Sequence, residues 1–304
     1  MKITRANESK SKPKLKAFSQ KVRSLDIGPR EFSHQFRKKE GSVLSIAHRE
    51  IIPLSKVDTI KHAADKMAVN RVRRLYIIDA KKSLEGMVSA TDIVNFLGGG
   101  DLHKIVSNRH NGVLEIAANE PVRQIMTENT ITISSAESLH DALIKMHSDN
   151  VGSLPITEGG SVIGVVTERD FVPLLGKYYS NKKVSDYMTR NVITGTAGMA
   201  VEDVAKVMIR NGFRRLPIVE DNELVGVVST IDLVSAFSRN PRSSLLETRI
   251  SEIMNRPFTI SEGISAEDAA DIMAKNSVGG LMVVSGKKLV GVFTERDLLR
   301  AAIS

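Results

Sequence analysis

The sequence repeats one short phrase four times, and this repetition constrains the fold more than any other feature. Each copy has a glycine, two apolar residues, a serine or threonine, two variable residues and an aspartate. The copies occupy residues 86–92, 164–170, 226–232 and 291–297. We interpret each copy as the end of a buried β-strand followed by the first turn of a helix. The free N–H groups of a helix start suit phosphate or sugar binding, so the four junctions are candidate ligand sites.

The residues before each phrase repeat as well. A helical stretch with one apolar face ends in a methionine, and a leucine follows eight residues later at the start of a β-rich run. The four faces are Ile60, Ala63, Ala64, Met67; Leu139, Ala142, Leu143, Met146; Val201, Val204, Ala205, Met208; and Ala266, Ala269, Ala270, Met273. An asparagine follows within four residues of each methionine, and asparagine tolerates the left-handed conformation that ends a helix. The asparagines are Asn70, Asn150, Asn211 and Asn276.

The repeated pattern therefore predicts that each unit has the order strand, helix, strand, turn, strand, helix over roughly 55 residues. One such unit is too small to bury its own sheet, so pairing two units sheet to sheet is expected. The units alternate: the first and third have an arginine doublet before the middle strand, and the second and fourth have glycine there. The true repeat is thus a pair of units, duplicated once.

The units divide the chain into six parts. Residues 1–42 form a basic, partly disordered arm, with helical spacing from Leu15 to Leu25. The units cover 43–97, 122–178, 182–240 and 248–304, and residues 98–121 connect the first two. The glycine triplet 98–100 follows a helix and lacks the Gly-Lys-Ser/Thr ending, which argues against a phosphate-binding P-loop.

Composition excludes several classes of protein. The 304 residues are 41% hydrophobic but contain no apolar run long enough to span a bilayer, so we expect no membrane association. The lack of cysteine excludes disulfides and thiolate metal ligands, which fits a cytoplasmic protein. The seven histidines form no metal-spaced pair, and no nucleophile–base arrangement is evident, so we predict neither a metal site nor an enzyme.

The net charge of +8 belongs to the arm alone. Residues 1–42 contain twelve Lys/Arg and four Asp/Glu, whereas the remaining residues contain 31 of each sign. The arm is either a solvated tail with a docked helix or a segment that contacts nucleic acid or an acidic partner.

The four units together resemble CBS (cystathionine β-synthase) domains, and the chain is similar to archaeal four-CBS-domain proteins. It is also similar to the nucleotide-sensing γ subunit of AMP-activated protein kinase. The resemblance covers residues 43–304 and rests on the four in-register phrases. The Arg-Arg-Leu-Pro and Thr-Glu-Arg-Asp elements and the junction 95–100 are typical of the adenine-nucleotide-binding branch of the family. It implies an α/β (α+β) fold of two tandem CBS pairs, with sheets packed against each other and helices outside.

The resemblance also implies the site residues. Adenosine ligands lie in clefts between paired CBS domains. Ribose contacts fall on Asp92, Asp170, Asp232 and Asp297, with Ser89, Thr167, Ser229 and Thr294 beside them. Phosphate contacts fall on Arg73, Arg74, Arg214 and Arg215, to which we add Arg169 and Arg296 because a guanidinium matches phosphate oxygens. Adenine contacts fall on Thr132, Thr194 and Thr259.

The sequence departs from the family at Pro53, in place of a fourth threonine, and at Tyr76 and Met282, in place of proline. We expect Gly152 and Gly279 to let the backbone approach a ligand closely.

Both residue classes have a second interpretation that needs no ligand. Ser/Thr-x-x-Asp is close to a capping box, although capping favours Glu or Gln at the fourth place. The arginine doublets suit a solvated or salt-bridged strand edge.

The function predicted from these observations is regulatory: a protein that senses AMP, ADP or ATP and transmits the energy state to an unidentified partner. The alternatives are a nucleic-acid-binding regulator that uses the arm, and a protein that binds S-adenosylmethionine, which would need the ribose aspartates but not the arginines. A homodimer is implied by the resemblance alone.

Overall fold

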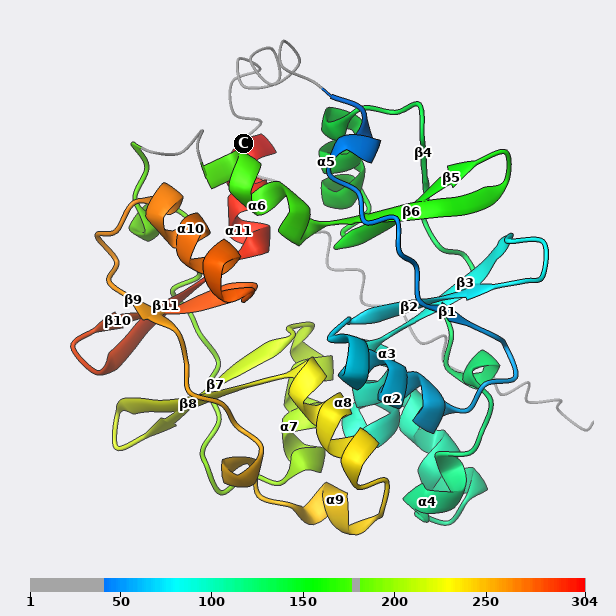
Figure 1. Cartoon of the computed structure of the whole chain (residues 1–304). Coiled ribbons are helices and arrows are strands. Elements are labelled where there is room, and N and C mark those ends of the chain that lie inside the picture. The colour runs from blue at the N-terminus through cyan, green and yellow to red at the C-terminus, as the bar shows by residue number, and fades with distance from the viewer. Residues whose placement is uncertain (1–40, 177–180, 304) are drawn as a thin grey trace, which may run out of the picture.

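A computed structural model of the chain describes residues 41–176 and 181–303. The disorder and the helix predicted for the basic arm lie outside these residues. Figure 1 shows four units around a common centre, with the hairpins of the first two units on one side of the view and those of the last two on the other. Residues 43–176 hold the first and second units and are here called the first module; residues 184–303 hold the third and fourth and are called the second module.

Every unit contains an antiparallel hairpin formed by its middle and last strands. The hairpins are β2 (Arg74–Ile78) with β3 (Leu84–Ser89), β5 (Ser153–Glu158) with β6 (Ser161–Thr167), β7 (Arg215–Glu220) with β8 (Glu223–Ser229), and β10 (Gly280–Ser285) with β11 (Lys288–Thr294). A short first strand runs parallel to the middle strand in three units: β1 (Pro53–Leu54), β4 (Ile133–Ser134) and β9 (Thr259–Ile260). In the third unit this strand is reduced to one parallel bridge between Gly195 and Ile218.

Two helices flank each hairpin, as the periodicity predicted. The first helices are α2 (Ile60–Asn70), α5 (Leu139–Ser148), α7 (Val201–Asn211) and α10 (Ala266–Asn276), and the predicted apolar faces are buried in all four. The helices that follow the phrases are α3 (Ala90–Val94), α6 (Glu168–Gly176), α8 (Thr230–Arg239) and α11 (Glu295–Ile303).

Among the helix-terminal asparagines, only Asn150 adopts the left-handed conformation, with φ 53°. In the other three units the left-handed residue is the next one along the chain: Arg71, Gly212 or Ser277. The asparagine stays helical there, because its side-chain amide donates to the carbonyl four residues earlier at 2.7–2.8 Å.

Within each module, the opening segment of each unit, before its first strand, crosses the phrase strand of the other unit. His48 and Val165 exchange two backbone hydrogen bonds of 2.9 Å, and the equivalent pairs are Met87–Thr127, Thr189–Val292 and Val227–Asn255. This crossing explains the phrase glycine. A Cβ atom at Gly86 would lie 2.7 Å from the carbonyl oxygen of Thr127, so a side chain there would prevent the close approach.

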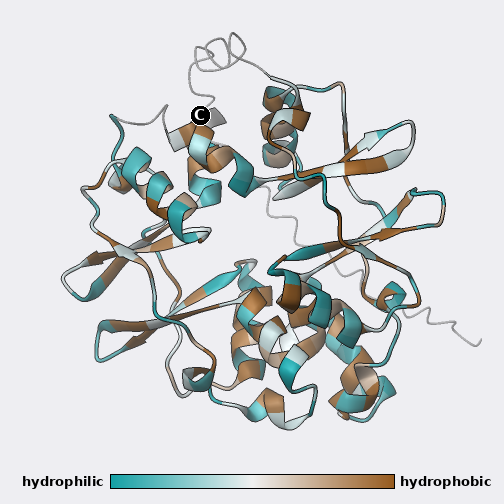
Figure 2. Ribbon diagram, in the orientation of Figure 1, coloured by the Kyte–Doolittle hydropathy of each residue, from teal (hydrophilic) through white to brown (hydrophobic). Residues whose placement is uncertain are grey.

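The two modules pack against each other through their helices. One core joins the helices of the first and third units, mainly η2 (Asn95–Gly99) with α7 and α2 with α8. A second core joins those of the second and fourth units, mainly α6 with α10 and α11. Figure 2 shows hydrophobic residues on the helices where they face one another. The helices therefore lie outside each sheet pair, and the same helices form the contact between the modules.

Short segments complete the structure. They are η1 (Val43–Ser45), η2 (Asn95–Gly99), η3 (Asp101–His103), η4 (Ile105–Arg109), α4 (Leu114–Ala117), η5 (Val122–Gln124), η7 (Val184–Asp186), α9 (Ser244–Glu247) and η8 (Ile250–Glu252). The connector is thus helical and packs into the first core. The glycine run of η2 lies against α7, where a Cβ on Gly98 would meet Glu202. Among the residues that the structure describes, no helix is long and apolar enough to cross a membrane.

Candidate functional site

The four phrase aspartates have the same local geometry. One carboxylate oxygen, Oδ2, accepts hydrogen bonds from both the backbone N–H and the hydroxyl of the serine or threonine three residues earlier. The pairs are Ser89–Asp92, Thr167–Asp170, Ser229–Asp232 and Thr294–Asp297. The capping interaction therefore exists at every junction. It saturates Oδ2, so a ligand hydroxyl would have to use Oδ1.

The aspartates differ in what Oδ1 meets. In Asp170 it lies 2.8 Å from Nε2 of His48, and in Asp297 it lies 3.9 Å from Nη1 of Arg300. Burial raises the pKa of Asp297 and of Asp92, although the hydrogen bonds from Thr294 and Ser89 oppose the shift. A buried carboxylate with a raised pKa gains from a ligand that donates hydrogen bonds to its ionised form.

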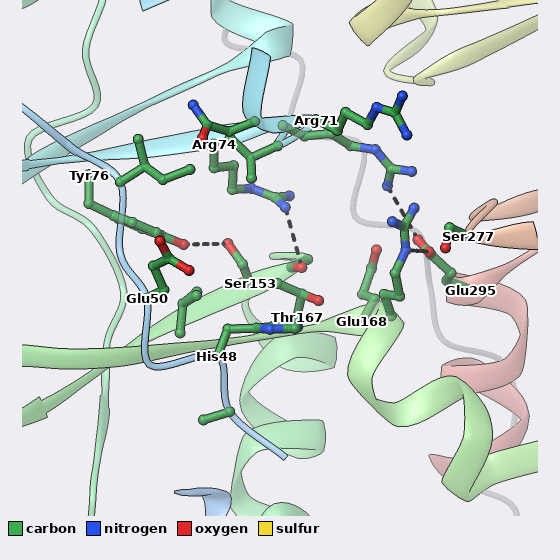
Figure 3. A pocket seen from close by; sticks show the side chains of 18 of the residues that line it. His48, Glu50, Arg71, Arg74, Tyr76, Ser153, Thr167, Glu168, Ser277 and Glu295 are labelled. Carbon is green, nitrogen blue, oxygen red and sulfur yellow. Dashed lines mark hydrogen bonds and ion pairs between the residues drawn. The ribbon is translucent and has the colours of Figure 1, made fainter. Parts of the chain in front are cut away.

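The first module contains a cleft of about 720 Å³ between its two units, and Arg214, Ser277 and Glu295 of the second module also line it. Figure 3 shows the side chains that line it. The chain segment 47–52 forms one wall, and the doublet Arg73-Arg74 and Tyr76 form another. The second unit contributes Thr167, Glu168 and Arg169. His48 lies on the cleft wall and contacts Asp170, so the imidazole occupies the oxygen that a ribose would need.

The second module has a cleft of about 330 Å³ in the corresponding place. It is lined by Thr189, residues 191–193, the doublet Arg214-Arg215, Pro217, and the phrase residues Thr294, Arg296 and Asp297. Thr189 stands where His48 stands in the first cleft, because both pair with the phrase strand at the same register. Pro217 stands where Tyr76 stands. Among the phrase aspartates, only Asp297 lines a cleft directly. Asp170 is next to the first cleft, where its neighbours Thr167 and Arg169 and its partner His48 form the wall. Asp92 and Asp232 line neither cleft.

Tyr76, one of the departures from the family pattern, has a structural role in the first cleft. Its hydroxyl and that of Ser153 are 3.2 Å apart, and the bond links the first unit to the second (Figure 3). Burial raises the pKa of the Tyr76 phenol, although Ser153 opposes the shift.

Four of the predicted phosphate-binding arginines form ion pairs, and every pair crosses from one module to the other. Glu168, of the first module, accepts from Arg214 at 2.8 Å and from Arg296 at 2.9 Å, both of the second module. Glu295, of the second module, accepts from Arg169 at 3.0 Å and from Arg73 at 3.4 Å, both of the first. The side chains of the two glutamates are only 4% and 2% exposed. The salt-bridge interpretation of the doublets is therefore correct for one arginine of each.

The other arginine of each doublet has no carboxylate within ion-pair distance among the described residues. Arg74 donates to the backbone carbonyl of Gly152 at 3.4 Å (Figure 3). Burial lowers the pKa of Arg74, and repulsion from Arg214 lowers it further. Burial and the charge of Arg73 together lower the pKa of Arg215 to about 9.

The glutamates show the opposite balance. Burial alone would raise the pKa of Glu295, but the charges of Arg73, Arg215 and Arg169 hold it down at about 2. Burial would also raise the pKa of Glu168, but the charges of Arg214 and Arg296 outweigh this effect and lower it. Six arginines thus surround the carboxylates of Glu168 and Glu295 at the contact between the modules. The positive charges there outnumber the negative ones.

The two glycines that we expect to admit a ligand also give space to the ion pairs. A Cβ at Gly152 would lie 2.8 Å from Oε2 of Glu168, and one at Gly279 would lie against Glu295 and Arg215. Close approach of a ligand to the backbone of these glycines stays a prediction.

None of the three strand threonines lines either cleft. Thr132 is half-buried, and Thr194 and Thr259 are exposed. In the second cleft the neighbouring residues 191–193 line the wall, and Thr194 follows them.

The sequence analysis missed Glu168, Glu295 and His48. The glutamates could have been found from their position in the repeated Thr-Glu-Arg-Asp element, but their arginine partners are distant in sequence. In the part of the chain that the structure describes, no group of three or more His, Cys, Asp or Glu residues is arranged to hold a metal ion.

Comparison with known proteins agrees with this architecture. The CBS domain family model matches residues 43–99, 122–177, 184–239 and 250–304. The uncharacterised protein MJ1225 of Methanocaldococcus jannaschii is 36% identical over 273 residues, which cover 85% of this chain and 98% of that protein. Its crystal structure, described as that of a candidate archaeal homologue of g-AMPK, matches with a TM-score of 0.81 over 86% of this chain and 99% of that one.

Two other similar proteins come from archaeal species. An uncharacterised 33.4 kDa protein encoded in a ribosomal RNA operon of Thermofilum pendens is 30% identical, over 81% of this chain and 87% of that protein. A conserved protein of Pyrococcus horikoshii matches with a TM-score of 0.56 at 18% identity, over 86% of this chain and all of that one, and shares the fold.

Proposed function

The chain belongs to the CBS domain family, and from this premise we propose that it is a regulatory protein that binds adenine nucleotides in the two clefts. The first cleft would use Asp170, Thr167, Arg73, Arg74 and Arg169. The second cleft would use Asp297, Thr294, Arg214, Arg215 and Arg296. In each, the ribose hydroxyls donate to the Oδ1 atom of the aspartate, and the phosphates face the arginines of the module interface.

The observation that carries the proposal is the unbalanced positive charge beside the helix-start aspartates. Buried arginines with lowered pKa values gain when an anion enters, because the anion restores the charged form. A guanidinium also matches a phosphate group with two parallel hydrogen bonds. A carboxylate for ribose and guanidinium groups for phosphate in one cleft fit a nucleotide better than a free base or an inorganic anion. The description of MJ1225 as a candidate homologue of g-AMPK supports the same assignment.

Calorimetric titration with AMP, ADP and ATP tests the proposal. We expect Asp170→Ala to weaken binding in the first cleft and Asp297→Ala to weaken it in the second, each by roughly 10–100-fold through lost charged hydrogen bonds. Asp92→Ala and Asp232→Ala are matched controls, because they remove the same helix cap at junctions whose phrase residues Ser89 and Ser229 line neither cleft. Full nucleotide affinity in the Asp170→Ala, Asp297→Ala double variant would reject the assigned sites.

S-adenosylmethionine is the alternative ligand, since it shares the ribose but lacks the phosphates. We expect it to compete weakly with AMP and to be insensitive to Arg215→Gln. Displacement of AMP by an equimolar amount of S-adenosylmethionine would favour this alternative.

A role of the basic arm in nucleic-acid binding is favoured by one observation: the whole net charge of the chain lies in residues 1–42. Such binding would weaken with salt and would be lost when the arm is removed. A homodimer and a regulated partner protein are part of the same proposal, and native mass spectrometry of the purified protein reports subunit number and carried-over nucleotide together.

A further inference from the structure

The two buried glutamates of the Thr-Glu-Arg-Asp elements lie in an unusual position. Each belongs to one module, and both ion pairs that each forms are with arginines of the other module. Both glutamates follow the phrase strand directly, at the first residue of α6 or α11. Gly152 and Gly279 provide the space for their carboxylates.

The arginines that they hold are side chains that line the clefts. Arg214 and Arg296 line the second cleft, and both donate to Glu168. Arg73 and Arg169 line the first cleft, and both donate to Glu295. Each carboxylate therefore neutralises the arginines that would receive phosphate in the opposite module.

We propose that Glu168 and Glu295 are crossed counter-charges: each sets the phosphate affinity of the cleft in the other module, and through them phosphate bound in one cleft weakens phosphate binding in the other. This inference rests on the proposed nucleotide sites and adds a route of communication between them.

The physical reason is competition for the same guanidinium groups. A phosphate in the second cleft shares Arg214 and Arg296 with Glu168 and weakens the hold of these arginines on that carboxylate. Glu168 is buried, and a buried carboxylate without its partner is costly, so it would turn to another cation. It lines the first cleft, and Arg74 is close enough to attract it. Negative charge then increases in the first cleft when the second is filled, which opposes phosphate there.

The test uses full-length protein with one cleft weakened. In an Asp170→Ala background the second cleft is the tighter site, and Glu168→Gln should raise its ATP affinity roughly tenfold, because the carboxylate that competes for its arginines is lost while the geometry is kept. In an Asp297→Ala background, Glu295→Gln should do the same for the first cleft. Adenosine is the internal control: it has no phosphate, so its affinity should stay unchanged in both variants.

The coupling is tested by titrating protein with both clefts intact. ATP should bind in two steps with the second weaker, and the steps should draw together in the Glu168→Gln, Glu295→Gln double variant, whereas adenosine should bind both clefts without coupling. Equal changes in ATP and adenosine affinity would show a structural role for the glutamates and overturn the inference. Unchanged ATP affinity would overturn it as well.

The same titrations distinguish an error in the proposed nucleotide sites from an error in the proposed counter-charges. If the unsubstituted protein bound neither ATP nor adenosine, the nucleotide sites themselves would be wrong. If it bound both and the glutamate variants did not alter ATP affinity, only the crossed counter-charges would be wrong.

Discussion

At the residue scale, the same side chains serve helix capping and a candidate binding site. Oδ2 of each phrase aspartate satisfies the helix start, and Oδ1 remains for another partner. The sequence predicted the aspartates and the arginines because they recur at fixed spacing. It could not predict that His48 would reach Asp170, since 122 residues separate them and the contact depends on one unit crossing the other.

His48 distinguishes the first cleft from the second, where Thr189 occupies the equivalent place. We expect His48→Thr to raise adenosine affinity in the first cleft, because Oδ1 of Asp170 is then free to accept from ribose. The His48 side chain is 65% exposed, so the bond is weak and the gain should be roughly threefold. Calorimetry in an Asp297→Ala background measures it.

The reciprocal change serves as the control. Thr189→His should lower adenosine affinity in the second cleft, measured in an Asp170→Ala background. An unchanged affinity in both variants would mean that the imidazole does not compete with ribose.

At the element scale, most of the fold was predictable. The helix faces, the hairpins and the pairing of units follow from periodicities of 3.6 and 2 residues and from the need to bury small sheets. Two features were not. The connector lacks periodicity because its helices are too short to show any, and the phrase glycine has a reason that lies in the other unit of the module, where a backbone segment crosses the strand.

This crossing predicts the effect of Gly86→Ala. The added Cβ would lie 2.7 Å from the carbonyl oxygen of Thr127, so the crossing segment must move. We expect a loss of about 1–3 kcal/mol in the free energy of unfolding, typical of overpacking, measured by urea denaturation. Gly263→Ala is the matched control, because nothing lies within 4 Å of its added Cβ. Equal stability of the two variants would show that the crossing is not tight.

At the scale of the whole molecule, the clefts and the contact between modules share one set of charges. The sequence predicted that units pair within a module, but the pairing of modules requires knowing which helix faces meet, and no local pattern encodes it. For that reason the arginines were predicted as phosphate ligands without their glutamate partners. The structure shows that four of them also fasten the modules together.

The stability that these ion pairs contribute depends on pH, and the sign of the dependence follows from the pKa of Glu295. Its pKa is about 2 in the folded protein, below the ordinary value of 4.5. A carboxylate with a depressed folded pKa stabilises the protein above its unfolded pKa, and the stabilisation is lost as the pH falls toward the folded pKa. The unfolding free energy should therefore fall between pH 4.5 and 2, with a contribution from Glu295 of about 3 kcal/mol.

Urea denaturation from pH 6 to pH 2.5 should show Glu295→Gln less stable than the unsubstituted protein at the upper end and converging with it at the lower end. Glu262→Gln, which breaks the exposed pair with Arg190, should show almost no such trend because solvent screens that pair. A constant difference between the Glu295 variant and the unsubstituted protein across this range would contradict the assignment, because the carboxylate would then be contributing through packing and not through its charge.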